Sequence, residues 1–381
     1  MNFREIHLRN FRNFNSTHLA LGSRLNFLVG DNGQGKTNFL EAIHLLCRGD
    51  SFRFAERKTL ISDYGRNTDA GQISAVIEKE NLSYDVEMWI DSQKKSILVN
   101  GKSSSSWRLV ELFPVVVFSP ESLSAIKDGP EQRRLLVDEL VLTSRYPGQA
   151  SVVREFGRCL RARNKILREL SEDGGSASTN SLRTLESLNS IFLVLGTQLT
   201  VARLESIRRL HPHLAEAWGL MHEGNTNISV DYLISDKSVL NYTEQDIYSA
   251  LHNRLQELAR TERSLGTSLV GPHKHEVRFL FAGNDSRFFC SQGQQRALII
   301  AFKTAQIVYH QQVHQTFPIL LLDDVMSELD KQRRESLMKF LEGISAQVLI
   351  TSTDLTWSEW FNSDHNRVFS VFAGRIRAHS D

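Results

Sequence analysis

The first third of the chain alternates short apolar runs with turn residues, a pattern typical of β-strands. Phe3–Leu8 and Leu25–Val29 are rich in apolar residues and bounded by turn signals, which predicts buried strands. From Asn38 to Leu46 the apolar residues recur at helical spacing instead. Further strands are predicted at 71–77, 82–90 and 96–99, and Asn100-Gly101 predicts a hairpin turn. This part is therefore predicted to be mostly sheet, with one helix.

From Glu131 to about Arg263 the pattern becomes helical. The stretches 148–170 and 182–210 carry apolar residues at helical spacing, and a Gly/Ser-rich loop at 171–181 joins them. Pro212 predicts a turn that ends the second helix. Strands are predicted again at 276–281, 317–323, 347–351 and 368–372. We expect an α/β head assembled from residues 1–130 and 262–381, with a helical arm inserted at 131–261.

Composition excludes several classes of protein. The 381 residues carry 45 Lys+Arg and 44 Asp+Glu, so no overall basic excess indicates nucleic-acid binding. The longest aliphatic runs fall far short of the roughly 20 residues that cross a bilayer, and the charged N-terminus lacks a signal-peptide core. Cys47, Cys159 and Cys290 lie too far apart for a disulfide framework or a zinc motif. We expect a cytoplasmic protein without a membrane segment.

A phosphate-binding motif follows the second predicted strand. Gly30–Thr37 reads GDNGQGKT, which matches G-x-x-x-x-G-K-[ST] between a strand and a helix. In such a loop the backbone N–H groups point at the phosphates. Lys36 is expected to reach the β- and γ-phosphates and Thr37 to hold Mg²⁺. The predicted nucleotide-binding residues of this loop are Gly30, Asp31, Asn32, Gly33, Gln34, Gly35, Lys36, Thr37 and Asn38.

A second motif ends the apolar run 317–323. A buried strand that ends in an acidic residue positions a carboxylate beside the Mg²⁺ of a phosphate loop. Asp323 is therefore the predicted metal-side residue, and Asp324 is predicted to orient or deprotonate the attacking water. Lys36 and Asp324 are the two predicted catalytic residues. Without the phosphate loop, the same pattern would equally describe a core strand that ends in a solvated turn.

Two shorter strings indicate the class of nucleotide-binding protein. SQGQQR (291–296) directly precedes an apolar helical run, so Ser291 is a candidate N-cap, and SELD occupies 327–330. The order of these motifs resembles the ABC-type ATPase head shared by transporters and SMC proteins. The resemblance implies ATP held between two protomers, with Ser291, Gly293 and Gln294 contacting the γ-phosphate in trans and Asp330 along the dimer seam. Simple helix capping is the alternative for Ser291.

The chain also resembles the RecF family of bacterial recombination mediators along nearly its whole length. The supporting strings are LRNFRNF (8–14), GDNGQGKTNFLEAIHLL (30–46), VVFSPESL (116–123), GPEQRRLLVDE (129–139), LVGPHKHE (269–276), SQGQQR and LLLDDVMSELD (320–330). The resemblance implies an SMC-like head with a short helical lobe. Two departures stand out: GPHKHE replaces the family's GPHRDD, which leaves the role of that loop in doubt, and the turn at 119–121 has no Q-loop glutamine.

A one-sided basic helix is the candidate DNA contact. Between 153 and 170 five cations recur at intervals of three and four, which places them on one helix face: Arg154, Arg158, Arg161, Lys165 and Arg168. Arg163 adds a sixth cation to this segment. Such a face suits phosphate contacts, but a solvated surface helix has the same pattern. Arg53, Arg57 and Lys58 form a second, weaker candidate on the head.

The resemblance implies an ATP-dependent DNA-binding protein that dimerises on ATP and clamps gapped or double-stranded DNA. It implies weak, DNA-stimulated hydrolysis of ATP with Mg²⁺. It also implies RecO- and RecR-type partner proteins, recombinase loading in DNA repair and replication restart, and a link to the SOS response. The alternatives are a nucleotide-gated protein-interaction module and the ABC-type head of a DNA-end-processing nuclease complex.

Overall fold

The chain divides into two compact units. The computed structural model describes residues 1–53, 55–62, 70–142, 149–172, 179–221, 226–353 and 366–378. The first unit comprises Met1–Ser124 and Ile299–Asp381 with the short segment Leu220–Glu223, and the second comprises Ala125–Gly219 and Gly224–Leu298. Segments from both ends of the chain thus form the first unit. The second unit begins at Ala125, a few residues before the predicted boundary at 131. It also includes residues 262–298, which the sequence pattern assigns to the head.

A mostly parallel sheet lies at the centre of the first unit. Its strand order is β16-β15-β3-β14-β13-β8, with β16 antiparallel to β15. The strands are β3 (Leu25–Val29), β8 (Val115–Phe118), β13 (Ile319–Leu322), β14 (Val348–Ser352), β15 (Arg367–Phe372) and β16 (Arg375–Ala378). β3, β8, β13 and β14 are buried throughout, as expected for parallel strands covered on both faces. Their mostly apolar sequences match this burial, with Asn26 in β3 and Thr351 and Ser352 in β14 as buried polar residues.

An antiparallel sheet forms the second layer of this unit. Its order is β2-β1-β4-β5-β6-β7. The strands are β1 (Asn2–Phe11), β2 (Phe14–Ala20), β4 (Ala70–Lys79), β5 (Leu82–Asp91), β6 (Lys95–Val99) and β7 (Lys102–Ser103). Helix α1 (Lys36–Arg48) contacts strands of both sheets, and its apolar residues are buried in one core with theirs. Its position between two layers explains why most residues of α1 are buried, Glu41 among them.

Short helical segments complete the first unit. They are η1 (Arg57–Leu60), α2 (Ser106–Leu112), α3 (Pro120–Leu123), η2 (Val325–Glu328) and α10 (Lys331–Gly343). Ser105 caps α2 by accepting from the N–H of Arg108, and Ser119 and Ser122 form a reciprocal capping box at α3. The turn at 119–121, which lacks a glutamine, is thus a helix start.

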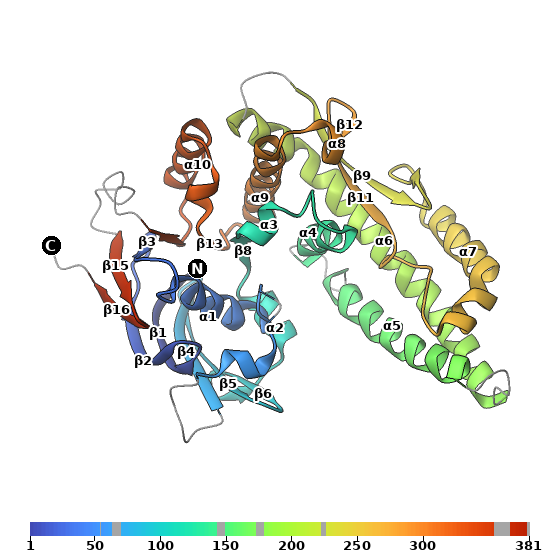
Figure 1. Cartoon of the computed structure of the whole chain (residues 1–381), viewed down its shortest axis with the longest axis horizontal. Helices are drawn as coiled ribbons and strands as arrows, with labels where there is room; N and C mark the ends of the chain where they lie inside the picture. Colours follow the sequence, from blue (N-terminus) through green and yellow to red (C-terminus); the bar gives the residue numbers. More distant parts are fainter. Residues whose placement is uncertain are drawn as a thin grey trace. The chain divides into compact units, whose positions relative to one another are not determined.

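Three long helices dominate the second unit (Figure 1). Its helices are α4 (Pro130–Leu142), α5 (Gln149–Glu172), α6 (Thr179–Met221), α7 (Glu244–Leu265) and α8 (Ser286–Phe289), and α9 (Gln292–His314) starts in it. A small sheet has the order β10-β9-β11-β12, from β9 (Ile228–Ile234), β10 (Lys237–Ser238), β11 (Glu276–Phe281) and β12 (Asn284–Asp285). The prediction that 131–263 is helical throughout is wrong for Ile228–Ile234, which form β9. This strand pairs with β11, which is distant from it in the sequence.

Helix α6 continues through Pro212 instead of ending there. Proline removes one helical hydrogen bond, but Leu214, Ala217 and Trp218 beyond it are buried, and this packing keeps the later turns helical. Residues 180–221 of α6 are long and apolar enough to cross a membrane by length and composition. Part of this stretch is buried within the unit, and the core helix of a soluble domain meets the same criteria. The predicted loop at 171–181 lies partly outside the described residues.

Two buried ion pairs tie the helices of the second unit together. Arg163 on α5 is 2% exposed and donates to Glu262 on α7 at 2.6 Å, and it also bonds Asn189 and Ser268. Arg203 on α6 makes a two-pronged contact with Asp138 on α4, at 2.7 and 2.9 Å. Arg163, the sixth cation of this segment, is therefore a structural residue and does not belong to the exposed basic face of α5.

We expect Glu262→Ala to lower the free energy of unfolding by about 3 kcal/mol, because it leaves the buried Arg163 guanidinium without its carboxylate. Glu257→Ala is the matched control on the same helix, since Glu257 is exposed and pairs with Arg254 at the surface; it should cost less than about 1 kcal/mol. Urea unfolding of the full chain, followed by circular dichroism, measures both. Equal losses in the two variants would contradict the structural role of Arg163.

Candidate nucleotide site

The loop Gly30–Lys36 connects the end of β3 to the start of α1, as the motif requires. Gly35 has φ 115°, a left-handed conformation that L-residues rarely adopt. A Cβ on Gly30 would lie 2.2 Å from the carbonyl oxygen of Val371, so only glycine fits there. Lys36 Nζ donates to the carbonyl oxygens of Gly30 (2.5 Å) and Asp31 (2.8 Å), which holds the ammonium against the loop. The first turn of α1 has no acidic residue, so its N-terminus suits an anion.

Asn13, in the turn between β1 and β2, fixes the outer side of this loop. Its Nδ2 donates to the carbonyl oxygen of Gln34 at 2.9 Å, and its Oδ1 accepts from Asn38 Nδ2 at 2.9 Å. Gln34 is held from the other side by the N–H of Ala373, at 2.6 Å from Gln34 Oε1. Sequence reasoning missed Asn13, although it lies in the LRNFRNF string. The available signal was a polar residue a few positions after the predicted strand at 3–8, but the strand that follows the turn, 14–20, was not predicted.

Asp323 lies directly beside Thr37, although the two are 286 positions apart in the sequence. Thr37 Oγ1 donates to Asp323 Oδ1 at 2.9 Å, and Thr351 Oγ1 donates to the same oxygen at 2.9 Å. Burial raises the pKa of Asp323, and the two hydroxyl hydrogen bonds oppose that rise. A threonine hydroxyl next to a buried carboxylate is a hard oxygen donor set that fits Mg²⁺. Thr351 was missed because the sequence does not reveal that β14 lies between β3 and β13.

Asp324 and Lys36 complete the charged groups at this site. Asp324 has φ 51° and ψ 23° and starts η2, and its N–H donates to Thr351 Oγ1 at 2.9 Å. Burial lowers the pKa of Lys36, and the carboxylates of Asp324, Asp323 and Asp31 oppose that effect. The sequence-predicted residues of the phosphate loop and of the acidic strand are thus brought together in the first unit.

Ser291 starts helix α9 in the manner of an N-cap. The N–H of Gln294 donates to Ser291 Oγ at 3.3 Å, and the Gln294 side-chain oxygen accepts from the N–H of Ser291 at 2.9 Å. This reciprocal pair is a capping box. Ser291 is exposed and Gly293 partly exposed, so the helix start is open to solvent. The structure thus gives Ser291 and Gln294 a capping role within the second unit; contact with a partner's phosphate stays a prediction.

Asp330 belongs to the first unit, where it caps α10. Its Oδ1 accepts from the N–H of Arg333 at 2.9 Å, and its Oδ2 accepts from Arg333 Nη1 at 2.7 Å. The SELD string is therefore a helix start in this chain. A position along a dimer seam remains a prediction for Asp330.

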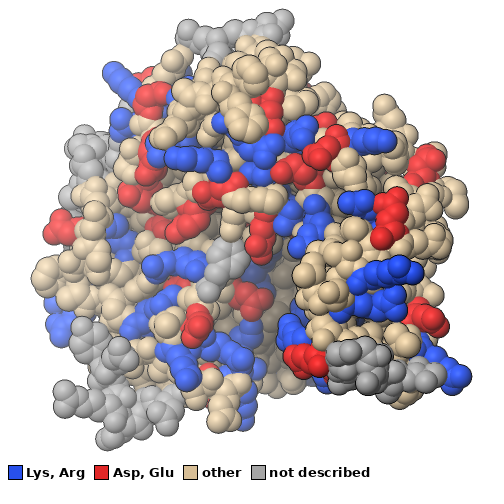
Figure 2. Space-filling view, turned by 45° about the vertical axis from the view of Figure 1, so that its right-hand side comes forward, with Lys and Arg blue, Asp and Glu red and all other residues tan. Residues whose placement is uncertain are grey.

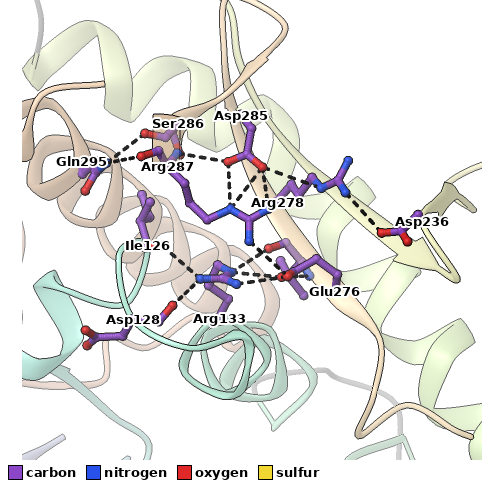
Figure 3. Close-up of polar contacts among 11 residues, drawn as sticks. Ile126, Asp128, Arg133, Asp236, Glu276, Arg278, Asp285, Ser286, Arg287 and Gln295 are labelled. Atoms are coloured by element: carbon purple, nitrogen blue, oxygen red, sulfur yellow. Dashed lines mark hydrogen bonds and ion pairs between the residues drawn. The ribbon is translucent and has the colours of Figure 1, made fainter. Parts of the chain in front are cut away.

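A network of charged side chains supports the segment before Ser291 (Figure 3). Glu276 on β11 makes a two-pronged contact with Arg133 on α4, at 3.0 and 3.1 Å, and also meets Arg287 on α8 at 3.3 Å. Asp285 holds the same Arg287 guanidinium at 2.6 Å. Gln295 on α9 donates to the carbonyl oxygen of Ser286 at 2.9 Å, which ties α8 to the first turn of α9.

This network assigns a role to the variant GPHKHE loop. Arg133 is 2% exposed, so Glu276 is the carboxylate that neutralises a buried cation. The neighbouring His275 is buried with its Nδ1 3.0 Å from the Tyr232 hydroxyl, and burial lowers its pKa well below the ordinary value. The loop thus supports the interior of the second unit through Glu276 and His275.

The basic face on α5 is exposed as the sequence pattern predicts. Arg158, Arg161, Lys165 and Arg168 are exposed, whereas Arg154 is partly buried near Glu155. Phe156, Leu167 and Leu170 are buried on the other side of the helix. Across the face drawn in Figure 2, Lys and Arg side chains alternate with Asp and Glu. Positive and negative side chains are thus mixed on that face, in keeping with the near-zero net charge.

The second basic candidate divides into two places. Arg57 and Lys58 line a cavity of about 830 Å³ together with Lys94 and Lys95. Arg53 instead donates to Asn38 Oδ1 at 3.2 Å, beside the phosphate loop. Asp50 and Glu56 also line this cavity, so its charge is mixed.

We expect Asp323→Asn to raise the melting temperature at pH 8 in the absence of nucleotide and Mg²⁺. Since burial raises the folded-state pKa of Asp323, the folded chain loses stability as pH rises through that pKa. Asparagine keeps an oxygen that accepts from Thr37 and Thr351 but carries no charge. A rise of roughly 2–4 °C would correspond to about 1 kcal/mol. The difference should shrink as the pH is lowered, because protonation removes the charge of Asp323. Asp85→Asn, on an exposed strand position, is the control; a lower melting temperature at pH 8 would contradict this account.

Comparison with known proteins places this site in a family. Residues 2–375 match the family model described as RecF/RecN/SMC N terminal domain. The chain is 33% identical to the DNA replication and repair protein RecF of Syntrophotalea carbinolica over 97% of both chains. It is also 33% identical to the protein of that name from Pelotomaculum thermopropionicum, over 99% of this chain and 100% of the other.

Solved structures give the same result. One described as "Structure of the recombination mediator protein RecF-ATP in RecFOR pathway" superposes with a TM-score of 0.86 at 28% identity, covering 99% of this chain and 97% of the other. An Smc head bound to part of ScpA shares the fold alone, at a TM-score of 0.58 and 14% identity. The chain has the fold of an ABC-type, SMC-like ATPase head and belongs to the RecF family.

Proposed function

We propose that this protein is an ATP-dependent DNA-binding mediator of recombinational repair. The observation that carries the nucleotide part of the proposal is the hydrogen bond between Thr37 and Asp323 beside a glycine-rich loop, because it joins a phosphate-binding helix start to a candidate metal-binding carboxylate. The similarity to RecF proteins of DNA repair supports the rest. The solved relative with ATP in its description supports ATP as the nucleotide. The reaction is ATP + H₂O to ADP + phosphate.

Each residue of the site has a role in this reaction. The loop N–H groups and Lys36 hold the phosphates, and Thr37 and Asp323 would hold Mg²⁺. When bound, Mg²⁺ neutralises the charge that develops between the β- and γ-phosphates. Asp324 accepts a proton from the attacking water or orients it. Its side chain is one methylene shorter than the glutamate of transporter ATPases, so we expect slow hydrolysis suited to a switch.

The second half of the site comes from another copy of the chain. The exposed, Ser291-capped start of α9 has N–H groups that suit an anion. In the proposed dimer Ser291, Gly293 and Gln294 contact the γ-phosphate bound by the partner, and Asp330 lies at the seam. ATP binding closes this dimer around DNA, and hydrolysis opens it.

DNA and protein partners follow from the surface and from the relatives. The exposed cations of α5 are the proposed phosphate contacts. The description of the solved relatives names the RecFOR pathway, which supports RecO- and RecR-type partners here. We infer a role in loading recombinase on gapped DNA in the cytoplasm, with a link to the SOS response.

We expect Lys36→Met to lower the rate of ATP hydrolysis in the presence of DNA by roughly 100-fold or more, because it removes the cation that holds the phosphates. Lys339→Met, an exposed position on α10, is the matched control and should retain the wild-type rate. Steady-state phosphate release with and without gapped duplex measures both variants. ATP-dependent dimerisation without DNA affinity or DNA-stimulated turnover would instead favour the nucleotide-gated interaction module.

Replacing Arg158 and Arg161 together by Glu should weaken DNA binding by at least about tenfold and leave ATP affinity unchanged. Two lost phosphate contacts should lower the slope of log K against log salt by about 2. The control replaces Arg254 and Arg260 on α7 by Glu, which changes the net charge equally. Fluorescence anisotropy with a labelled gapped duplex over a salt series gives both numbers. Unchanged DNA affinity in the α5 variant would exclude this helix from the DNA interface.

A further inference from the structure

Two histidines and a glutamate gather on the outer face of the β1–β2 pair. The register places His7 directly opposite His18, and Glu5 lies two residues before His7 on the same face of β1. The imidazole rings are stacked, with centroids 3.9 Å and planes 16° apart. His18 Nε2 lies 3.1 Å from Glu5 Oε2, and one ligand atom from each residue lies within 4.8 Å of the other two.

We propose that Glu5, His7 and His18 form a binding site for one divalent transition-metal ion, which neither the family nor the nucleotide chemistry requires. Two imidazole nitrogens and one carboxylate oxygen are a borderline donor set. Such a set suits Zn²⁺, Ni²⁺ or Cu²⁺, whereas Mg²⁺ and Ca²⁺ favour oxygen ligands alone. The site is therefore distinct in chemistry from the Thr37–Asp323 oxygen pair.

The geometry allows a metal ion to draw the three ligands together. Ligand atoms about 2.1 Å from a tetrahedral ion lie about 3.4 Å apart. His18 and Glu5 have side chains that are 54% and 40% exposed, so small rotations can close the remaining distance. The backbone beneath them is fixed by the paired strands. The open coordination positions face solvent, where water can fill them.

A bound ion would join β2, the edge strand of its sheet, to β1. The turn of this hairpin carries Asn13, which contacts the phosphate loop, and Arg12, which pairs with the buried Glu41 of α1 at 2.7 Å. The site thus lies on the hairpin that supports the nucleotide loop. Because an ion that binds only the folded chain stabilises it, metal should also raise the melting temperature.

Titration of Zn²⁺ into the metal-free full chain tests the proposal by isothermal calorimetry. We expect one site in the wild type whose affinity falls by at least about tenfold in His7→Ala and in His18→Ala, with a smaller loss in Glu5→Gln. The matched control removes two other histidines, His211 and His252 on α6 and α7, and should keep the site.

A spectroscopic measurement separates metal binding from loss of fold. With one equivalent of Cu²⁺, electron paramagnetic resonance should show two coupled nitrogens in the wild type and one in either single-histidine variant. Circular dichroism of the same samples checks the fold, and because all three side chains lie on a sheet surface, no variant should unfold. An unchanged affinity and unchanged nitrogen coupling in both histidine variants would overturn the proposal.

Discussion

The contact between Thr37 and Asp323 depends on the arrangement of the whole first unit. The two residues follow β3 and β13, which come from opposite ends of the chain and flank β14 in the parallel sheet. Since parallel strands end at the same edge, this order brings the phosphate loop, the acidic strand end and Thr351 together. The sheet needs β3 and β8 from the N-terminal part of the chain and β13 to β16 from the C-terminal part. The second unit is inserted in the chain between β8 and β13, and these two strands still pair in the sheet. The site can therefore form despite the insertion.

The same contact explains a conflict between stability and chemistry. Asp323 is buried next to two hydroxyls, and its ionised form is disfavoured there. Lys36 is likewise buried with its pKa lowered. Both charges are costly in the chain alone, and we expect bound phosphates and Mg²⁺ to offset this cost. We therefore expect nucleotide binding to be favoured, because it offsets the free-energy cost of burying these two charges.

Local patterns predicted the elements on which the site depends. The glycines at 30, 33 and 35, the buried strand before Asp323 and the cap at Ser291 are all properties of a few neighbouring residues, and each appears in the structure as expected. The helical spacing of α5 placed five cations on one face, of which Arg158, Arg161, Lys165 and Arg168 are exposed and Arg154 is partly buried. The burial of Arg163 could not be predicted, because its carboxylate partner Glu262 lies on another helix.

Contacts between distant segments could not be predicted in this way. Asn13 and Thr351 reach the site through strand order, and β9 was read as helix because its partner β11 is more than forty residues away. The continuation of α6 through Pro212 depends on buried side chains beyond the proline. The trio of Glu5, His7 and His18 depends on the register of β1 and β2, and the sequence pattern did not predict β2.

We propose that ATP joins two copies of this chain through the phosphate loop of one and the Ser291 helix start of the other. Light scattering coupled to size-exclusion chromatography, with and without ATP, tests it most directly when the wild type is compared with Ser291→Arg. The account predicts a molar mass that doubles with ATP in the wild type and stays that of a monomer in the variant. A wild type that remains monomeric with ATP, alone and with gapped duplex, would contradict it.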